Sequence, residues 1–169
     1  LWFWPALEDG LLRAKVGIRT NAGEKLETIE SPVWAKLFLR SESDGAGRSK
    51  IDEQAKSASL SMTVDVPERA EDPLLKKAAA TAAVSLTRIA SDEEETLPER
   101  VRSTIALVRG ARMVVEYQTR PSYGYLPSFV GFVRAGNWRG STSSDDALEA
   151  LLRDSEPPAH DKWDANAEK

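Results

Sequence analysis

A strict alternation of apolar and polar residues between Ala58 and Val66 is the feature that most constrains how this chain can fold. Every second residue of the segment is apolar, and the residues between them are serine, threonine or aspartate. Successive side chains of a β-strand point to opposite faces of a sheet, so the pattern predicts a half-buried strand that ends before Pro67. Such a strand requires neighbours to pair with and a second layer to cover its apolar side.

Three other segments of the first half fit the same interpretation. Residues 12–19 alternate in the same way and predict a second half-buried strand. Asn21-Ala22-Gly23 then favours a turn, because Asn and Gly tolerate positive φ, and residues 25–29 form a weaker return strand. Residues 33–39 carry apolar side chains on both faces, as expected for a strand that is covered on both sides.

Two helices are predicted to open the second half. Asp72 followed by Pro73 is a favoured helix start, and residues 74–89 are rich in alanine, which suits a buried helix with close neighbours. The acidic residues 92–95 are interpreted as a solvated loop. Residues 96–110 then repeat apolar side chains at helical spacing and end at a glycine.

Two strands and a short helix are predicted to follow. Residues 113–117 and 129–133 are dominated by β-branched and aromatic side chains, and we expect them to form a two-stranded element. Asp145 is expected to cap a helix over residues 146–153. Pro157-Pro158 cannot continue that helix and stops it.

These segments predict an α+β fold, with a mostly antiparallel sheet in the first half, then two helices, a two-stranded element and a short C-terminal helix. We expect one domain over residues 8–154, sheet-rich over 8–66 and helix-rich over 72–153. The aromatic residues 1–7 are predicted to be a truncated segment that packs against chain upstream; the alternative is a clipped strand completed within this chain. Residues 155–169 are predicted to be a linker or tail.

The composition excludes several classes of site. The chain has no cysteine, which removes disulfides, thiolate zinc sites and cysteine nucleophiles, and which fits a reducing compartment. No apolar run approaches the roughly 18 residues that span a bilayer. We therefore expect a cytoplasmic protein without membrane contact.

No recognised catalytic or cofactor-binding pattern is present. Gly45-Ala46-Gly47 lies in the polar stretch 41–54 and lacks both the Walker A pattern and the third glycine of a dinucleotide fingerprint. No lysine stands two positions after an acidic residue, the arrangement of a common class of metal-dependent nucleases. His160 is the single histidine and lies in the predicted tail, where a general base is rarely held rigidly. We expect no catalytic residue, metal ligand or cofactor in this segment.

One asymmetry in charge remains. Between Leu97 and Gly140 the chain has seven arginines and no lysine, opposed by two glutamates, although its net charge is −4. Arginines interleaved with aromatic residues can bind phosphates and stack on bases, and Arg102 and Arg109 would share one face of the predicted helix. The predicted nucleic-acid-binding residues, here called the arginine cluster, are Arg100, Arg102, Arg109, Arg112, Arg120, Tyr123, Tyr125, Arg134, Trp138 and Arg139.

Three stretches suggest a family: residues 108–117 (VRGARMVVEY), 129–133 (FVGFV) and 155–163 (SEPPAHDKW). In this order they resemble the C-terminal region of large bacterial GHKL-type ATP-binding proteins, which are similar to eukaryotic microrchidia ATPases and tend to belong to phage-defence or restriction-like operons. That family's ATP site needs an Asn-bearing helix and an Asp-x-Gly-x-Gly turn, which Asp44-Gly45-Ala46-Gly47 does not fit. The resemblance therefore implies that ATP binds upstream of Leu1 and that this segment is an accessory domain.

Three functional hypotheses remain open. The first is a non-catalytic accessory domain of an ATP-driven defence protein, serving coupling, dimerisation or nucleic-acid contact. The second is a nucleic-acid-binding module that uses the arginine cluster, unless those arginines pair with the acidic first half of the chain or with a missing domain. The third is a hydrolase with an unrecognised site, which requires polar groups that converge in a pocket. The partners considered are the missing N-terminal part of the protein, nucleic acid and a second copy of the chain.

Overall fold

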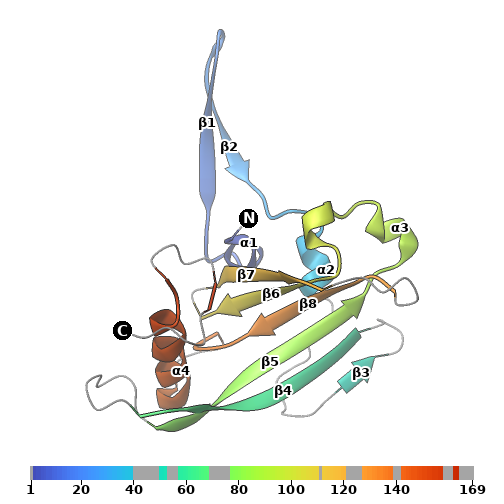
Figure 1. Ribbon diagram of the computed structural model, residues 1–169. Coiled ribbons are helices and arrows are strands. Elements are labelled where there is room, and N and C mark those ends of the chain that lie inside the picture. The colour runs from blue at the N-terminus through green and yellow to red at the C-terminus, as the bar shows by residue number, and fades with distance from the viewer. Residues whose placement is uncertain are drawn as a thin grey trace.

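The computed structural model describes residues 2–39, 50–52, 57–68, 77–110, 112–120, 127–138, 142–157 and 162–163. A six-stranded sheet with helices on both faces forms the body, and a two-stranded hairpin projects from it (Figure 1). This confirms the predicted α+β class. In chain order the elements are α1 (Trp4–Glu8), β1 (Ala14–Thr20), β2 (Gly23–Ile29), α2 (Ala35–Leu39), β3 (Lys50–Asp52), β4 (Ser57–Val66), β5 (Ala78–Arg88), α3 (Ser91–Glu94), the 3₁₀ turn η1 (Glu99–Val101), β6 (Thr104–Arg109), β7 (Met113–Thr119), β8 (Phe129–Arg134) and α4 (Ser143–Asp154).

The strands of the sheet lie in the order β3-β4-β5-β8-β6-β7. β6 and β8 run parallel, and every other neighbouring pair is antiparallel. β8, the last strand in sequence, thus lies between β5 and β6. The predicted two-stranded element of residues 113–117 and 129–133 is therefore wrong: both segments are strands, but β6 separates them.

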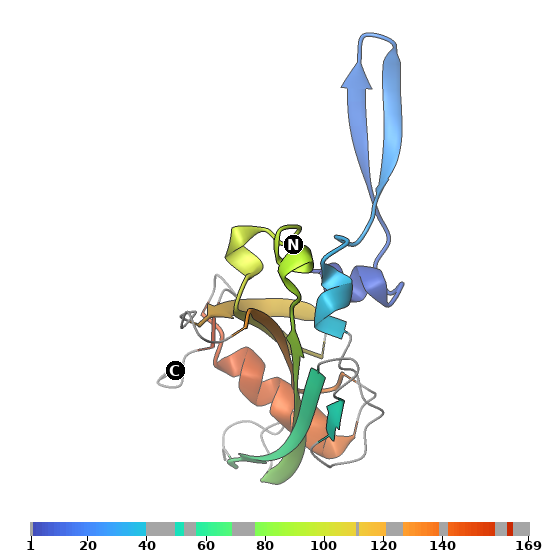
Figure 2. The same cartoon turned by 90° about the vertical axis from the view of Figure 1, so that its right-hand side faces the viewer.

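Different elements cover the two faces of the sheet (Figures 1 and 2). On one face α4 lies across β4 and β5, where Ala147 and Leu148 pack against Val66, Ala80 and Ala82. On the opposite face α1 packs on β7, and α2 packs on β5 and β8. The body is therefore a three-layer arrangement with two separate apolar clusters.

Aromatic side chains fill the second of these clusters. The fully buried Trp4 ring has its centroid 6.1 Å from that of Trp34, 5.4 Å from Phe38 and 5.6 Å from Phe132. Its indole Nε1 donates a 2.9 Å hydrogen bond to the hydroxyl of Tyr117. Burial raises the pKa of Tyr117 to about 12, an effect that this hydrogen bond partly opposes. The N-terminal aromatic segment thus supplies a central core residue of this chain.

The helix predicted over residues 74–89 is wrong, because β5 is a strand paired with β4 on one side and β8 on the other. Its buried alanines, Ala80 and Ala82, lie where α4 crosses the sheet. Small side chains at these positions allow the helix to approach the strands closely. Pairing along the whole of β4 outweighs the helix propensity of alanine.

The helix predicted over residues 96–110 is also wrong. Only the short turn η1 forms, and Ser103, at φ 49°, adopts a left-handed conformation that ends it. The helical spacing combined apolar residues from two elements, since Val101 belongs to η1 and Val108 to β6. The residues of β6 that face the aromatic cluster are fully buried: Thr104, Ala106 and Val108.

Two shorter predictions also fail. Residues 33–39 contain the helix α2 in place of a strand, and the four-residue spacing brings the rings of Trp34 and Phe38 to a centroid distance of 5.8 Å. Asp145 is not the cap of α4, which begins earlier than predicted. The Thr142 side chain caps the helix by accepting a 3.1 Å hydrogen bond from the backbone N–H of Asp145.

The hairpin β1–β2, here called the arm, stands clear of the body in two perpendicular views (Figures 1 and 2). Its strands of seven residues pair along their full length and are joined by Asn21-Ala22. All residues of both strands are exposed except Ala14, which is half-buried. The strands predicted over residues 12–19 and 25–29 are confirmed, but the half-buried state predicted for the first is wrong.

Candidate interaction surfaces

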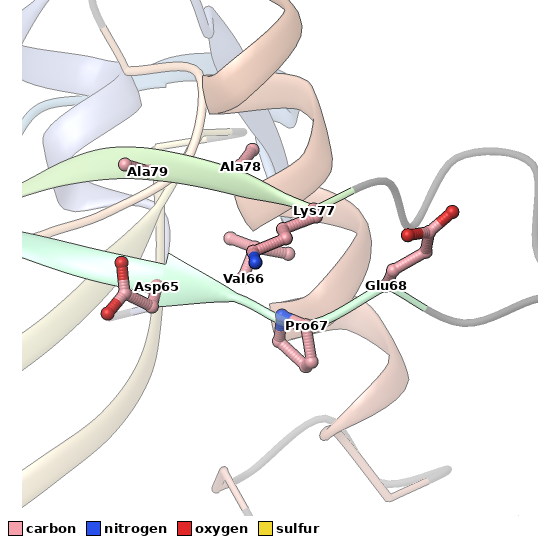
Figure 3. Close-up of a pocket in the computed structure, with 7 residues that line it drawn as sticks. All are labelled: Asp65, Val66, Pro67, Glu68, Lys77, Ala78 and Ala79. Atoms are coloured by element: carbon pink, nitrogen blue, oxygen red, sulfur yellow. The ribbon is translucent and has the colours of Figure 1, made fainter.

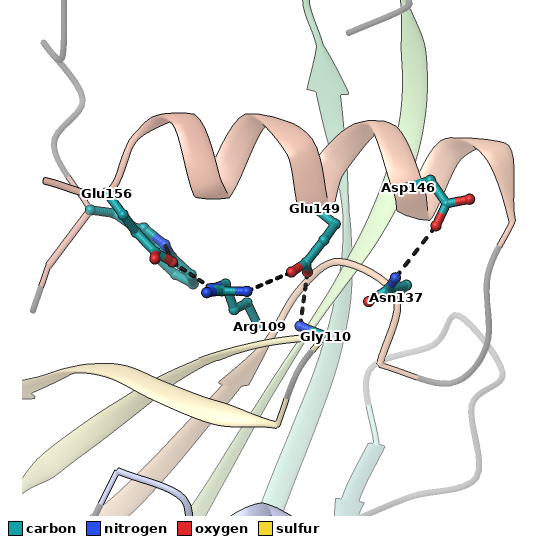
Figure 4. Close-up of polar contacts among 7 residues, drawn as sticks. Arg109, Gly110, Asn137, Asp146, Glu149 and Glu156 are labelled. Atoms are coloured by element: carbon teal, nitrogen blue, oxygen red, sulfur yellow. Dashed lines mark hydrogen bonds and ion pairs between the residues drawn. The ribbon is translucent and has the colours of Figure 1, made fainter. Parts of the chain in front are cut away.

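The fold divides the arginine cluster and places one of its members inside the protein. Arg109, at the end of β6, lies between two carboxylates of the C-terminal region (Figure 4). Its Nη1 donates a 2.8 Å hydrogen bond to Glu149, and its Nε lies 2.6 Å from a carboxylate oxygen of Glu156. The side chains of Arg109 and Glu149 are 12% exposed and that of Glu156 is 0% exposed. The guanidinium is therefore occupied by internal ion pairs.

The surrounding backbone is shaped around Glu149. The N–H of Gly110 donates a 2.9 Å hydrogen bond to its Oε2. Gly136 has φ +76°, and a Cβ there would lie 2.2 Å from the same oxygen. Beside this network, Asn137 donates a 3.4 Å hydrogen bond to Asp146 (Figure 4). These contacts fasten α4 to the end of β6, which is a structural role.

Two more arginines stack on the ring of Trp138. The Arg112 guanidinium lies 4.9 Å from the ring centroid, pairs with Asp9, and donates to the backbone carbonyl of Trp138 at 3.3 Å. Arg134, only 5% exposed, lies 5.8 Å from the same centroid and 5.7 Å from that of Phe132. Trp138 is itself buried. Its ring is thus part of the core and is not presented for stacking on a base.

The remaining described members lie on neighbouring backbone where β6 begins and β7 ends: the N–H of Arg120 donates a 2.8 Å hydrogen bond to the carbonyl of Ser103, next to Arg102. Arg100 and Arg120 are exposed, and Arg102 is half-buried. Arg102 and Arg109 do not share a helix face, since one follows η1 and the other ends β6. Internal pairing is therefore the observed state of Arg109 and Arg112, and nucleic-acid binding by the others stays a prediction. The members outside the described residues are Tyr123, Tyr125 and Arg139.

A hollow of about 690 Å³ lies where β4 ends and β5 begins (Figure 3). The carboxylates of Asp65 and Glu68 point away from each other on either side of Val66, so its polar groups do not converge on one point. The lining residues are Asp65, Val66, Pro67, Glu68, Lys77, Ala78 and Ala79.

Metal sites and membrane-spanning helices are not found in the part of the chain that the structure describes. There, no three side chains that could bind a metal lie together, and no helix is long and apolar enough to cross a membrane. The acidic residues 92–95, predicted as a loop, lie mostly in the short helix α3. Gly45-Ala46-Gly47 and His160 are outside the described residues.

The arm and its base, here the flanking residues 2–13 and 30–39, carry most of the exposed apolar side chains. Among the described residues, nine of the twelve exposed large apolar side chains lie between residues 2 and 33, and the other three lie on the sheet. Leu26, in β2, is 64% exposed, and Val33, at the base, is 88% exposed. A concentration of exposed apolar side chains on one part of a protein marks a site of interaction.

The two faces of the arm differ in character. One face carries Val16, Ile18 and Ile29 beside an ion pair of 2.9 Å between Lys25 and Glu27. The opposite face consists of Lys15, Gly17, Arg19, Glu24, Leu26 and Thr28. Both faces therefore combine exposed apolar side chains with charges of both signs.

No family model matches this chain, and no curated protein or solved structure is significantly similar to it. A functional assignment therefore rests on the geometry of the described residues. Of the surfaces above, only the arm combines full exposure with a concentration of apolar side chains.

Sequence reasoning missed the two carboxylates that bind Arg109. Glu149 is 40 positions away along the chain, and no local pattern connects the two residues. The arm was also missed as a surface. Its alternation predicted the strands, but alternation alone does not show whether the apolar side is covered by another element.

Proposed function

We propose that this chain is a non-catalytic accessory domain and that the arm is the surface with which it binds another polypeptide chain. The observation that carries the proposal is the exposure of the arm together with its apolar side chains. An isolated two-stranded hairpin is only marginally stable in water. The exposed apolar side chains of the arm also remain in contact with water, which is unfavourable. A bound partner would cover these side chains and supply the missing packing.

The base of the arm supports a role in contact. In sequence, α1 precedes β1 and α2 follows β2. The rings of Trp4, which comes before the arm, and Phe38, which comes after it, lie 5.4 Å apart in the core. The backbone N–H groups of Leu11 and Leu12 both donate to the carbonyl of Ala6, at 2.9 and 3.0 Å. The arm is thus held at both ends by the aromatic core of the body, so it is presented to a partner from a fixed base.

The cellular setting is part of the proposal. The absence of cysteine favours a cytoplasmic location. The resemblance to C-terminal regions of GHKL-type ATP-binding proteins suggests an accessory role in a phage-defence protein. ATPase or nuclease activity in this chain alone would contradict a non-catalytic role.

Site-specific photo-crosslinking tests the arm as a contact surface. A benzophenone amino acid is introduced at Leu26 of the full protein in its host, and a matched control carries it at Leu60, a leucine of the sheet that is 48% exposed. We expect a discrete cross-linked polypeptide from position 26 and little from position 60. Equal cross-linking at both positions, or none at position 26, contradicts the proposal.

A further inference from the structure

We infer that the partner of the arm is the arm of a second copy of this chain, joined edge to edge through an antiparallel β2–β2 pairing centred on Leu26. The inference rests on the proposed function and specifies the partner, the strand and the register. Three observations carry it: the open edges of the arm, the signs of charge along each strand, and the exposure of Leu26.

Both long edges of the arm are open in the described part of the chain, since β1 and β2 pair only with each other. An open edge presents rows of backbone N–H and C=O groups that can pair with another strand. Because two residues join the strands, Thr20 and Gly23 form the hydrogen-bonded closing pair. Such pairs recur at every second position, so Glu24, Leu26 and Thr28 direct their backbone groups outward from β2.

Charge favours β2 over β1 as the strand that pairs with a second copy. The charged residues of β1 are Lys15 and Arg19, both basic. An antiparallel β1–β1 pairing centred on Gly17 places Lys15 opposite Arg19 of the second copy, and like charges directly opposite destabilise a sheet. β2 carries both signs and avoids this repulsion.

One register of the β2–β2 pairing matches the charges. Centred on Leu26, it places Lys25 of each copy opposite Glu27 of the other, in a pair whose side chains lie close together. It also places Glu24 opposite the neutral Thr28. Shifting the second strand by two residues in either direction keeps the same backbone groups paired. One shift places Lys25 opposite Lys25 of the second copy, and the other places Glu27 opposite Glu27. Among the symmetric pairings of like strands, the charges therefore favour β2 and this register.

The same register brings together the two copies of the most exposed apolar side chain of the arm, and each covers part of the other. The two copies of Leu26, each 64% exposed in the single chain, meet at the two-fold axis. Leu26 leans over Gly17, where an added Cβ would lie 3.7 Å from its Cδ2. The paired arms form a four-stranded ribbon, and on its other face Lys25 and Glu27 of both copies lie between the Val16 and Ile18 side chains of the two outer strands.

A single introduced cysteine tests the position of the two-fold axis, because the chain has none of its own. Directly opposite residues in a hydrogen-bonded pair have Cα atoms about 5.5 Å apart, within the range that a disulfide bridges. We expect Leu26→Cys to form a disulfide-linked dimer under oxidised glutathione. The control is Leu11→Cys, at a leucine 67% exposed at the base of the arm, which we expect to remain monomeric. Equal dimer formation by the two variants overturns the register.

Charge reversal tests the pairing in solution by sedimentation velocity. We expect Lys25→Glu and Glu27→Lys each to raise the dimer Kd about tenfold, since each variant sets two like-charge pairs across the axis. An equimolar mixture of the two variants restores both opposite-charge pairs between chains, although each chain keeps its own like-charge clash within β2. Recovery of dimer in the mixture supports the inference, and failure to recover overturns it.

The two proposals fail in distinguishable ways. A polypeptide of different mass cross-linked at Leu26, together with a monomer in sedimentation, overturns the self-pairing and leaves the arm as a contact surface. Absence of both cross-linking and dimerisation overturns both proposals.

Discussion

The arm and the body of this protein are built from similar strands but bury them to opposite extents. In β6, Thr104, Ala106 and Val108 are fully buried beneath the aromatic cluster. In β1, Val16 and Ile18 also occupy alternate positions along a strand but are 45% and 39% exposed. The difference arises from the covering layer: short helices cover the sheet, and no described element covers the arm. An alternating sequence thus determines that a strand has two unlike faces, while the remaining elements determine whether the apolar face is buried.

The largest expected effect is in the body. Trp4→Ala removes the ring that contacts Trp34, Phe38 and Phe132, and leaves a cavity in the core. We expect it to lower the free energy of unfolding by about 3–5 kcal/mol, measured by urea denaturation. A loss below about 1 kcal/mol would show that the N-terminal segment is not part of the core, and would remove the contrast with the arm.

The next largest effect is expected for the buried ion pairs of Arg109. Arg109→Met leaves two buried carboxylates without their guanidinium, and we expect a loss of about 3 kcal/mol in the free energy of unfolding. The control, Arg120→Met, changes an exposed arginine and should shift stability by less than about 0.5 kcal/mol. Similar small values for both variants would mean that Arg109 is free to bind a ligand.

Tyr117 provides a smaller, pH-dependent test of the aromatic core. Its pKa in the folded protein is about 12, above the ordinary 10, so the phenol ionises first in the unfolded chain. The resulting stabilisation is full below pH 10 and is lost as the pH rises toward 12, amounting to about 2 kcal/mol. Denaturation curves between pH 9 and 12 measure it. In Tyr117→Phe this component of the pH dependence should vanish, and its persistence would assign the effect to another group.

The smallest expected effect is in the arm. Val16→Ser combined with Ile18→Ser replaces two exposed side chains, so the unfolding free energy of the dilute single chain should change by less than about 0.5 kcal/mol. Neither residue lies in β2, so the double variant should leave the β2–β2 self-association intact, which sedimentation at increasing concentration measures. A large loss of stability in the dilute chain would show that the arm is packed and not free.

The sequence was sufficient to predict strands where local pattern and tertiary context agree. Residues 58–66 and 129–133 were predicted as strands because β-branched or alternating apolar residues dominate them. Residues 74–89 were mistaken for a helix, since the reason for their alanines is the approach of α4, which begins more than fifty residues later. The ion pairs of Arg109 also depend on residues that are distant in the sequence. The charges of Arg109 and Glu149 are visible in the sequence, but their pairing depends on how α4 docks on β6.

The position of β8 has a consequence for how the chain acquires its structure during synthesis. A ribosome completes β4, β5, β6 and β7 before it makes the strand that lies between β5 and β6. Until residues 129–134 emerge, the strands of the sheet can form only two separate units, β3–β4–β5 and β6–β7, each with an open inner edge that can mispair. Insertion of β8 closes both edges at once through pairings distant in sequence, which are slow to form. The body therefore becomes a single cooperative unit only after residues 129–134 have emerged, whereas the arm, whose pairing is entirely local, can begin to pair as soon as it leaves the ribosome.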